Sequence, residues 1–164
     1  MKHHPSTVRI SCPSPLGPLI LAATDTGLAG VWFENQKHLP DTSVWPVQPD
    51  HPVLQTATRQ LAEYFAGQRR HFELPLDIRA GTPFQQSVWQ ALLTIAPGAT
   101  LSYGTLSQRI GKPRAVRAVG AAVGRNPLSI VVPCHRVLGA QGALTGYAGG
   151  LDRKIALLQL ETAL

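Results

Sequence analysis

The chain has 164 residues, 44% of them hydrophobic and 15% charged, which allows a buried core and excludes a disordered chain. No apolar run approaches the roughly 18 residues of a membrane span, and the N-terminus lacks the apolar segment of a secretory signal. Two cysteines 122 residues apart form no disulfide framework, and no Cys/His cluster has zinc-ligand spacing. We therefore expect a reduced, cytoplasmic protein without a metal or membrane association.

The net charge of +6 comes entirely from the second half of the chain. Residues 1–80 contain seven bases and seven acids, whereas residues 81–164 contain eight bases and two acids, Asp152 and Glu161. A solvated helix face normally mixes both signs, so a stretch of one sign favours a nucleic acid or another anionic partner. We predict an N-terminal domain over 1–80 and a C-terminal domain over 81–164.

The first half has the pattern of a small α+β unit. Alternating apolar residues predict a hairpin meander followed by one more strand, and a helical spacing of apolar residues ends at Gly67. The predicted strands cover 7–12, 19–23, 28–33 and 72–78, and the predicted helix covers 53–66.

The second half is mostly helical in pattern. Helices are expected over 82–95, 102–110, 114–124 and 151–160, with Ser102 as an N-cap. The second and third of these flank the break Gly111-Lys112-Pro113, which makes them a helix-turn-helix candidate. Between the third and fourth, residues 128–132 predict a buried strand or extended segment, and the glycine-rich stretch 139–150 predicts a loop.

The helix over 114–124 separates into two faces. Its outer face combines arginines with very small side chains, which lets the backbone approach a nucleic-acid groove closely. An ordinary amphipathic helix that is rich in alanine is the alternative. The core face is predicted to hold Val116, Val119 and Val123, and the outer face Arg114, Arg117, Ala118, Ala121 and Arg125.

Cys134 follows the apolar segment in the sequence Val132-Pro133-Cys134-His135-Arg136. Only a thiolate is strongly nucleophilic, so a reactive cysteine needs a base or a positive field, which His135 and Arg136 can supply. The alternative is a buried structural cysteine. We interpret Cys12 in that second way, because it alternates with apolar residues of a predicted strand and has no base beside it.

Residues 130–137, Ile-Val-Val-Pro-Cys-His-Arg-Val, resemble the active-site signature of O6-alkylguanine-DNA alkyltransferases, which repair DNA by a suicide reaction. The resemblance covers essentially all of 82–164, and it extends more loosely to the first half through 14–17 and 62–67. It implies an α+β fold with an RNase H-like N-terminal domain and a winged helix-turn-helix C-terminal domain. Further matching segments are 100–104, 117–120, 125–127, 144–150 and 157–161.

The resemblance also implies chemical roles. Cys134 would accept an alkyl group from O6 of guanine (or O4 of thymine), His135 would take the thiol proton, and Glu161 would orient the imidazole. Asn126 would form the turn before the active-site segment, and Tyr147 would donate a proton to the departing base. Without the resemblance, Glu161 would be an exposed acid near the C-terminus, and Tyr147 could equally be a buried aromatic anchor.

A target atom inside a duplex is reached only after the nucleotide flips out, so the implied partner is double-stranded DNA containing O6-alkylguanine. In the family that the sequence resembles, the recognition helix enters the minor groove of the DNA. The resemblance implies that Arg117 would fill the gap in the base stack and that Tyr103 would press on a phosphate. No cofactor is implied, and a monomer is expected. The implied DNA-contacting residues are Tyr103, Arg117, Ala118, Ala121, Arg125 and Arg136.

The sequence departs from the family pattern near the predicted pocket. Ser129 replaces a proline of animal members, and Gly146 and Ala148 replace the Asn and Ser of some members, which leaves the tolerated alkyl size open. Two alternatives to alkyl transfer are a non-catalytic, lesion-sensing or regulatory DNA-binding module and a cysteine hydrolase. The presence of Cys134 disfavours the first, and the adjacency of nucleophile and base disfavours the second.

Overall fold

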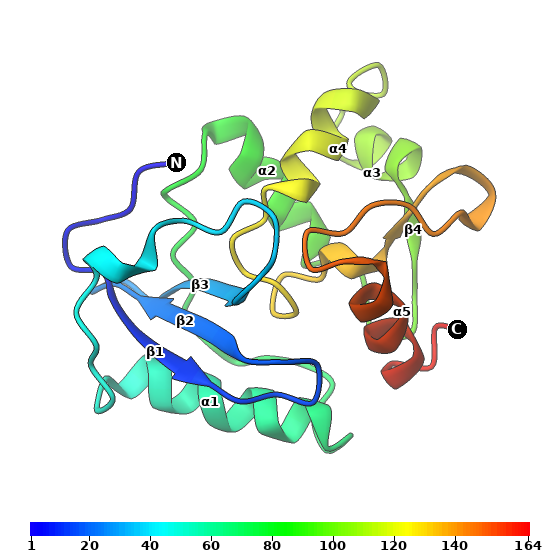
Figure 1. Cartoon of the computed structure of the whole chain (residues 1–164). Helices are drawn as coiled ribbons and strands as arrows, with labels where there is room; N and C mark the ends of the chain where they lie inside the picture. Colours follow the sequence, from blue (N-terminus) through cyan, green and yellow to red (C-terminus); the bar gives the residue numbers. More distant parts are fainter.

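The computed structural model of the protein describes all residues, 1–164. In the N-terminal half a three-stranded antiparallel sheet has the order β1-β2-β3, and helix α1 runs along it. The helical second half lies on the other side of the sheet (Figure 1). Proline at the first position of α1 and a left-handed Gly67 after it mark the two ends of that helix. These elements are β1 (Val8–Cys12), β2 (Leu19–Ala23), β3 (Leu28–Phe33) and α1 (Pro52–Phe65).

The second half contains four helices and a two-stranded parallel sheet. A capping box between Thr82 and Gln85 starts α2, and the Ser102 hydroxyl caps α3 as predicted. The α+β fold class is confirmed. The elements are α2 (Pro83–Leu92), β4 (Leu101–Ser102), α3 (Tyr103–Arg109), α4 (Val116–Gly124), β5 (Val137–Leu138) and α5 (Leu151–Leu160), with 3-10 turns at Thr42–Val44, Cys134–Arg136 and Ala140–Gly142.

One hydrophobic core of 26 buried residues runs through both halves. Backbone pairing joins them, since the Val31 amide in β3 donates to the Pro127 carbonyl and the Ser129 amide donates back to Val31. Within the second half, the Trp89 indole of α2 donates to the Ala122 carbonyl of α4 at 2.8 Å. The division at residue 80 stays a prediction, and the shared core makes the position of one half depend on the other.

Two predicted extended segments fold differently. The strand prediction over 72–78 is wrong: only one isolated bridge pairs this segment with β3, at Leu76 and Leu28. Pro75 has no N–H to donate, which limits the ladder there. Residues 128–132 are buried as predicted, but they form tight turns, with the Val131 amide bonded to Ser129 and Ile130 at a φ of 73°. A β-branched residue rarely adopts that backbone conformation, so the surrounding packing must hold it.

The helix-face predictions hold with two exceptions at helix starts. Val119 and Val123 are buried, whereas Val116, expected in the core, is 40% exposed. Leu151, an apolar residue that the helix over 151–160 could have turned inward, is also exposed. Each is the first residue of its helix, α4 and α5 respectively, and extends past the core that the later turns cover. No helix has the length and apolarity that crossing a bilayer requires.

Candidate active site and DNA-binding surface

The backbone before Cys134 is braced by one buried side chain, Asn126. Its Nδ2 donates to the Val132 carbonyl at 2.8 Å, and its Oδ1 accepts from the Leu128 amide at 2.9 Å. The amide therefore closes the turn from both ends and fixes where Cys134 begins its short 3-10 turn. This geometry fits the turn-forming role that the resemblance implies for Asn126.

Cys134 lines a cavity of about 190 Å³ between α4, the glycine-rich loop and the loop after β3. Tyr147 lines this cavity, and its buried hydroxyl has no hydrogen-bond partner in the protein. Such an orphaned donor is suited to a ligand group, because leaving it unpaired costs free energy. The other lining residues are Lys37, His38, Tyr103, Gly120, Val123, Gly124, Gly146 and Ala148.

The Cys134 thiol is neutral in the resting protein. Burial raises its pKa to about 11, and the Asn126 hydrogen bond and the Lys154 charge oppose this only in part. Nucleophilic attack requires the thiolate. A neighbouring group must therefore take the thiol proton at neutral pH.

His135 has the protonation pattern of such a base. Its ring Nε2 lies 2.8 Å from Oε2 of Glu161, and both residues are buried. Burial raises the pKa of Glu161, but hydrogen bonds from Arg136 and His135 outweigh it and hold that pKa well below its usual range. An ionised carboxylate only accepts, so Nε2 carries the proton and Nδ1 is a bare acceptor. Burial lowers the pKa of His135, and its Nδ1 has no partner in the protein.

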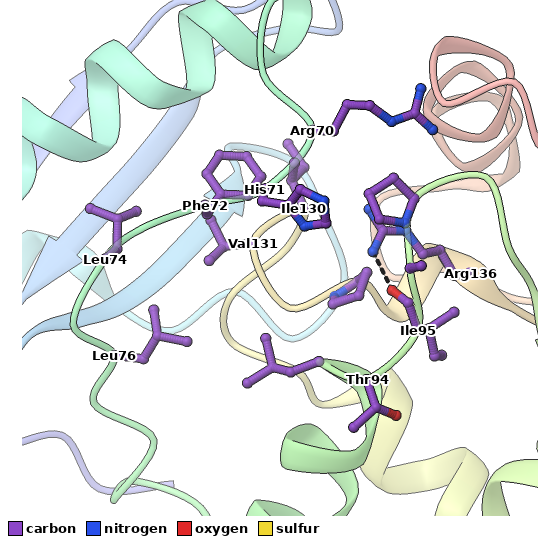
Figure 2. A pocket seen from close by; sticks show the side chains of 14 residues that line it. Arg70, His71, Phe72, Leu74, Leu76, Thr94, Ile95, Ile130, Val131 and Arg136 are labelled. Atoms are coloured by element: carbon purple, nitrogen blue, oxygen red, sulfur yellow. Dashed lines mark hydrogen bonds between the residues drawn. The ribbon is translucent and has the colours of Figure 1, made fainter.

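The burial of Arg136 conflicts with the prediction that this residue contacts DNA. The residue is 6% exposed, and its guanidinium makes a bidentate pair with the Glu161 carboxylate. The Nε donates to Oε1 at 2.8 Å and Nη2 donates to Oε2 at 2.9 Å. The third nitrogen, Nη1, donates to the Ile95 carbonyl beyond the end of α2 (Figure 2). This bond borders a cavity of about 270 Å³ between the two halves. The basic residue faces inward because the only acid near this site, Glu161, is buried beside it.

Two site residues were missed by sequence reasoning. The Tyr64 hydroxyl, from α1 in the other half, donates to Glu161 Oε2 at 2.6 Å. Lys154 in α5 is fully buried, and its Nζ donates to the carbonyls of Val137, Thr145 and Gly146, so it ties the loop that carries Tyr147 to β5. Lys154 precedes the buried Leu157 and Leu158 by three and four residues, and this helical spacing could have revealed its inward position. Tyr64 had no local signal beyond its place on an apolar helix face.

The outer face of α4 is exposed as predicted. Arg117, Ala118 and Ala121 lie on α4 itself, Arg114 lies in the turn before it and Arg125 is its C-cap. None of the three arginines forms an ion pair with an acid. Tyr103, at the start of α3, lines the Cys134 cavity, so the helix-turn-helix and the thiol share one surface. No group of three or more His, Cys, Asp or Glu side chains could hold a metal ion. The exposed residues of this face are Arg114, Arg117, Ala118, Ala121 and Arg125.

Comparison with known families decides the relationship. Residues 83–163 match the DNA-binding domain of 6-O-methylguanine DNA methyltransferase, and residues 8–78 match the ribonuclease-like domain of the same family. The chain belongs to the 6-O-methylguanine DNA methyltransferase family. The resemblance drawn from the Pro-Cys-His-Arg segment is thereby confirmed.

Relatives named methylated-DNA–protein-cysteine methyltransferase align over most of the chain. The one from Mycobacterium tuberculosis H37Rv is 51% identical over 148 residues, 90% of this chain and 88% of its own. The one from Methanosarcina acetivorans is 48% identical and covers 90% and 94% of the two chains. Both alignments therefore include residues from the two halves of this chain.

Solved structures of family members have the same arrangement. The crystal structure of Mycobacterium tuberculosis O6-methylguanine methyltransferase is 48% identical, with a TM-score of 0.86 and coverage of 96% of this chain and 93% of its own. A structure from the same organism, of OGT in complex with DNA, has a TM-score of 0.85 at the same identity, covering 96% and 92%. These comparisons do not favour the alternative of a non-catalytic DNA-binding module.

Proposed function

We propose that this protein transfers an alkyl group from O6 of guanine in duplex DNA to the sulfur of Cys134, once and irreversibly. As a member of its family it is a methyltransferase that repairs DNA by direct reversal. The observation that carries the assignment of the acceptor is the partnerless Nδ1 of His135, next in sequence to a buried thiol that lines a cavity. The neutral imidazole is the base that this thiol needs.

The proposed step balances its bonds and protons. His135 Nδ1 takes the proton from Cys134, directly or through one water, while Glu161 stabilises the imidazolium that forms. The sulfur attacks the alkyl carbon, the S–C bond forms and the C–O6 bond breaks. The base leaves as guanine after it receives a proton from the Tyr147 hydroxyl, whose lack of a partner leaves it free to bond the base. The proton held by His135 then returns Tyr147 to its neutral form through water, so the net transfer is of the thiol proton to the base. Thymine alkylated at O4 offers the same kind of leaving oxygen.

Because Cys134 lies at a cavity and not on the outer face of α4, the target nucleotide must leave the base stack to reach it. Unstacking costs a few kcal/mol, and an arginine inserted from α4 offsets part of that cost. We assign the insertion to Arg117, phosphate contacts to Arg125 and Tyr103, and the close approach of the helix to Ala118 and Ala121. Lys37, which reaches the same cavity from the N-terminal half, adds a further cation.

The protein is proposed to act as a monomer in the cytoplasm and to be consumed by the reaction. An S-alkylcysteine is a thioether, which offers water no good leaving group, and the site has no residues arranged to hydrolyse it. The alkyl group therefore stays on Cys134. Sedimentation of the protein with and without a short duplex checks the monomer.

The test is a transfer experiment with duplex DNA that contains O6-methylguanine labelled in the methyl carbon. We expect label on the peptide that contains Cys134, at no more than one methyl per protein, and unmodified guanine in the DNA. Label on another residue, or more than one transfer per protein molecule, would contradict the proposal.

A further inference from the structure

The Glu161 carboxylate is held by more than its bond to His135. It accepts four hydrogen bonds while being 3% exposed: one from His135, two from the Arg136 fork and one from the Tyr64 hydroxyl. Three of the four therefore come from residues that have no part in the proposed proton transfer. A buried carboxylate with this many donors, one of them a guanidinium, stays ionised and fixed in orientation.

We propose that Arg136 and Tyr64 are positioning residues for alkyl transfer: by holding Glu161, they keep the His135 proton on Nε2 and leave a bare Nδ1 for Cys134. This inference rests on the proposed function. It also means that the N-terminal half contributes a side chain to the active-site network.

The role of Arg136 follows from charge. Its guanidinium neutralises Glu161 within hydrogen-bond distance, so the carboxylate does not draw a second proton onto the buried imidazole. Without Arg136, an ionised Glu161 beside His135 favours the imidazolium, and an imidazolium cannot act as the base. The bond from Nη1 to Ile95 at 2.6 Å anchors the guanidinium, so the fork keeps one orientation.

Tyr64 acts in the same direction with a smaller effect. Its ring is wedged against Phe65 and Phe72, with centroids at 5.4 Å from each, so the hydroxyl is aimed at Glu161. Burial and the nearby Glu161 charge raise the pKa of Tyr64 far above its usual value, so it stays protonated and donates. A neutral donor withdraws part of the carboxylate charge and leaves less of it to stabilise a proton on His135.

The surroundings of His135 contain few other charged or titratable groups. The positive charge of Lys154 opposes protonation of the imidazole. The Nη2 of Arg70 donates to the backbone carbonyl of Glu161 at 3.4 Å. Cys134 is the adjacent thiol. The groups that face His135 from its own turn, from α1 and from α5 are thus Cys134, Arg136, Tyr64, Lys154 and Glu161, with Arg70 at the edge.

The test compares the pH dependence of the single-turnover transfer rate for the wild type, Tyr64→Phe and Arg136→Gln, with labelled O6-methylguanine duplex as substrate. On the acid side of this profile, the rate rises with pH as His135 loses its proton and becomes able to act as the base; we call this rise the acid limb. The Arg136 charge lowers the pKa of His135 and also neutralises the Glu161 carboxylate bonded to it, so the acid limb of Arg136→Gln should move upward by about one pH unit or more. Tyr64→Phe should move the limb upward by less, about half a unit, since it removes a neutral donor.

The control is Ala57→Gly, in the same helix as Tyr64 and equally buried but not in contact with Glu161. Glycine is a poorer helix former than alanine, so this variant weakens the helix but should leave the acid limb in place. If the wild type transfers the label but Tyr64→Phe has an unshifted limb, the positioning role is wrong, even where Arg136→Gln fails to fold. A wild type that transfers nothing would instead overturn the proposed function.

Discussion

The arginines on and beside α4 (Arg114, Arg117 and Arg125) and Arg136 are the same residue type within one basic stretch, yet they occupy opposite environments. Those on the outer face of α4 are exposed and unpaired, whereas Arg136 is buried and forks onto Glu161. The first environment suits a mobile, anionic partner such as a phosphate backbone, and the second holds a buried carboxylate. Charge counted along the sequence predicts a partner, but the direction of each side chain decides which arginine meets it.

The largest expected effect comes from replacing Cys134, whose thiol lies between the exposed arginines and the buried Arg136 pair. Cys134→Ser should abolish alkyl transfer, because a hydroxyl at this position is a far weaker nucleophile than a thiolate. Affinity for duplex DNA should remain within about twofold, since the outer face of α4 supplies the phosphate contacts. Label transfer and fluorescence anisotropy measure the two. Cys12→Ser is the matched control and should retain transfer, whereas residual transfer by the Cys134 variant would remove that residue as the acceptor.

Glu161→Gln tests the buried side of the comparison. The change leaves the Arg136 guanidinium buried without its counter-charge, which costs about 3–5 kcal/mol in the free energy of unfolding. Urea denaturation measures that cost, and transfer should fall strongly because His135 loses the negative charge that stabilises its imidazolium form. Arg125→Gln on the exposed face should change the free energy of unfolding by no more than about 0.5 kcal/mol. If Glu161→Gln and Arg125→Gln lowered the free energy of unfolding equally, the buried pair and the exposed arginines would not differ in their contribution to stability.

Arg117→Ala tests the exposed side. Transfer from duplex DNA should fall by roughly 10- to 100-fold, the loss expected when an arginine worth about 1–3 kcal/mol no longer fills the stack. Transfer from free O6-methylguanine base should hardly change, because no flipping is needed. Arg59→Ala in α1, also an exposed arginine, is the control on both substrates. Equal losses on duplex and free base would show that Arg117 takes no part in flipping.

The smallest effect is a pH dependence of stability. The pKa of His135 is lowered by burial in the folded protein, so the unfolded chain binds its proton more readily. The stability from this residue is therefore complete above the unfolded value of about 6.5 and declines as the pH falls below it, by at most about 1.4 kcal/mol per pH unit. The pKa of Glu161 is depressed, so its contribution persists across this range and is lost only in stronger acid.

Urea denaturation of the wild type and of His135→Gln between pH 7 and pH 5 measures the difference in slope. His3 and His38 also have lowered pKa values, and they contribute equally to both proteins. Parallel slopes would mean that His135 is protonated to the same extent in the folded and unfolded chains.

Local features of the fold were predictable because they depend on neighbouring residues. The meander, the caps of α2 and α3, and the exposed face of α4 follow from periodicity and capping within a few positions. The strand predicted over 72–78 failed because its ladder requires a partner and an N–H at Pro75. The turns at 128–132 were not predicted because apolar β-branched residues normally indicate a strand. Here the Asn126 side chain, backbone hydrogen bonds within the turns and the surrounding core hold the segment bent.

The sequence by itself determined the family, the fold class, the candidate nucleophile and the sign and location of the charge, since each is written in contiguous residues. Only the tertiary structure decided that Arg136 faces inward and that Tyr64, 97 residues from Glu161, completes its hydrogen bonds. A carboxylate removed from water must find donors wherever the packed chain brings them. Spacing along the sequence reveals which side of an element is apolar, but not which distant polar group lies across the core from it.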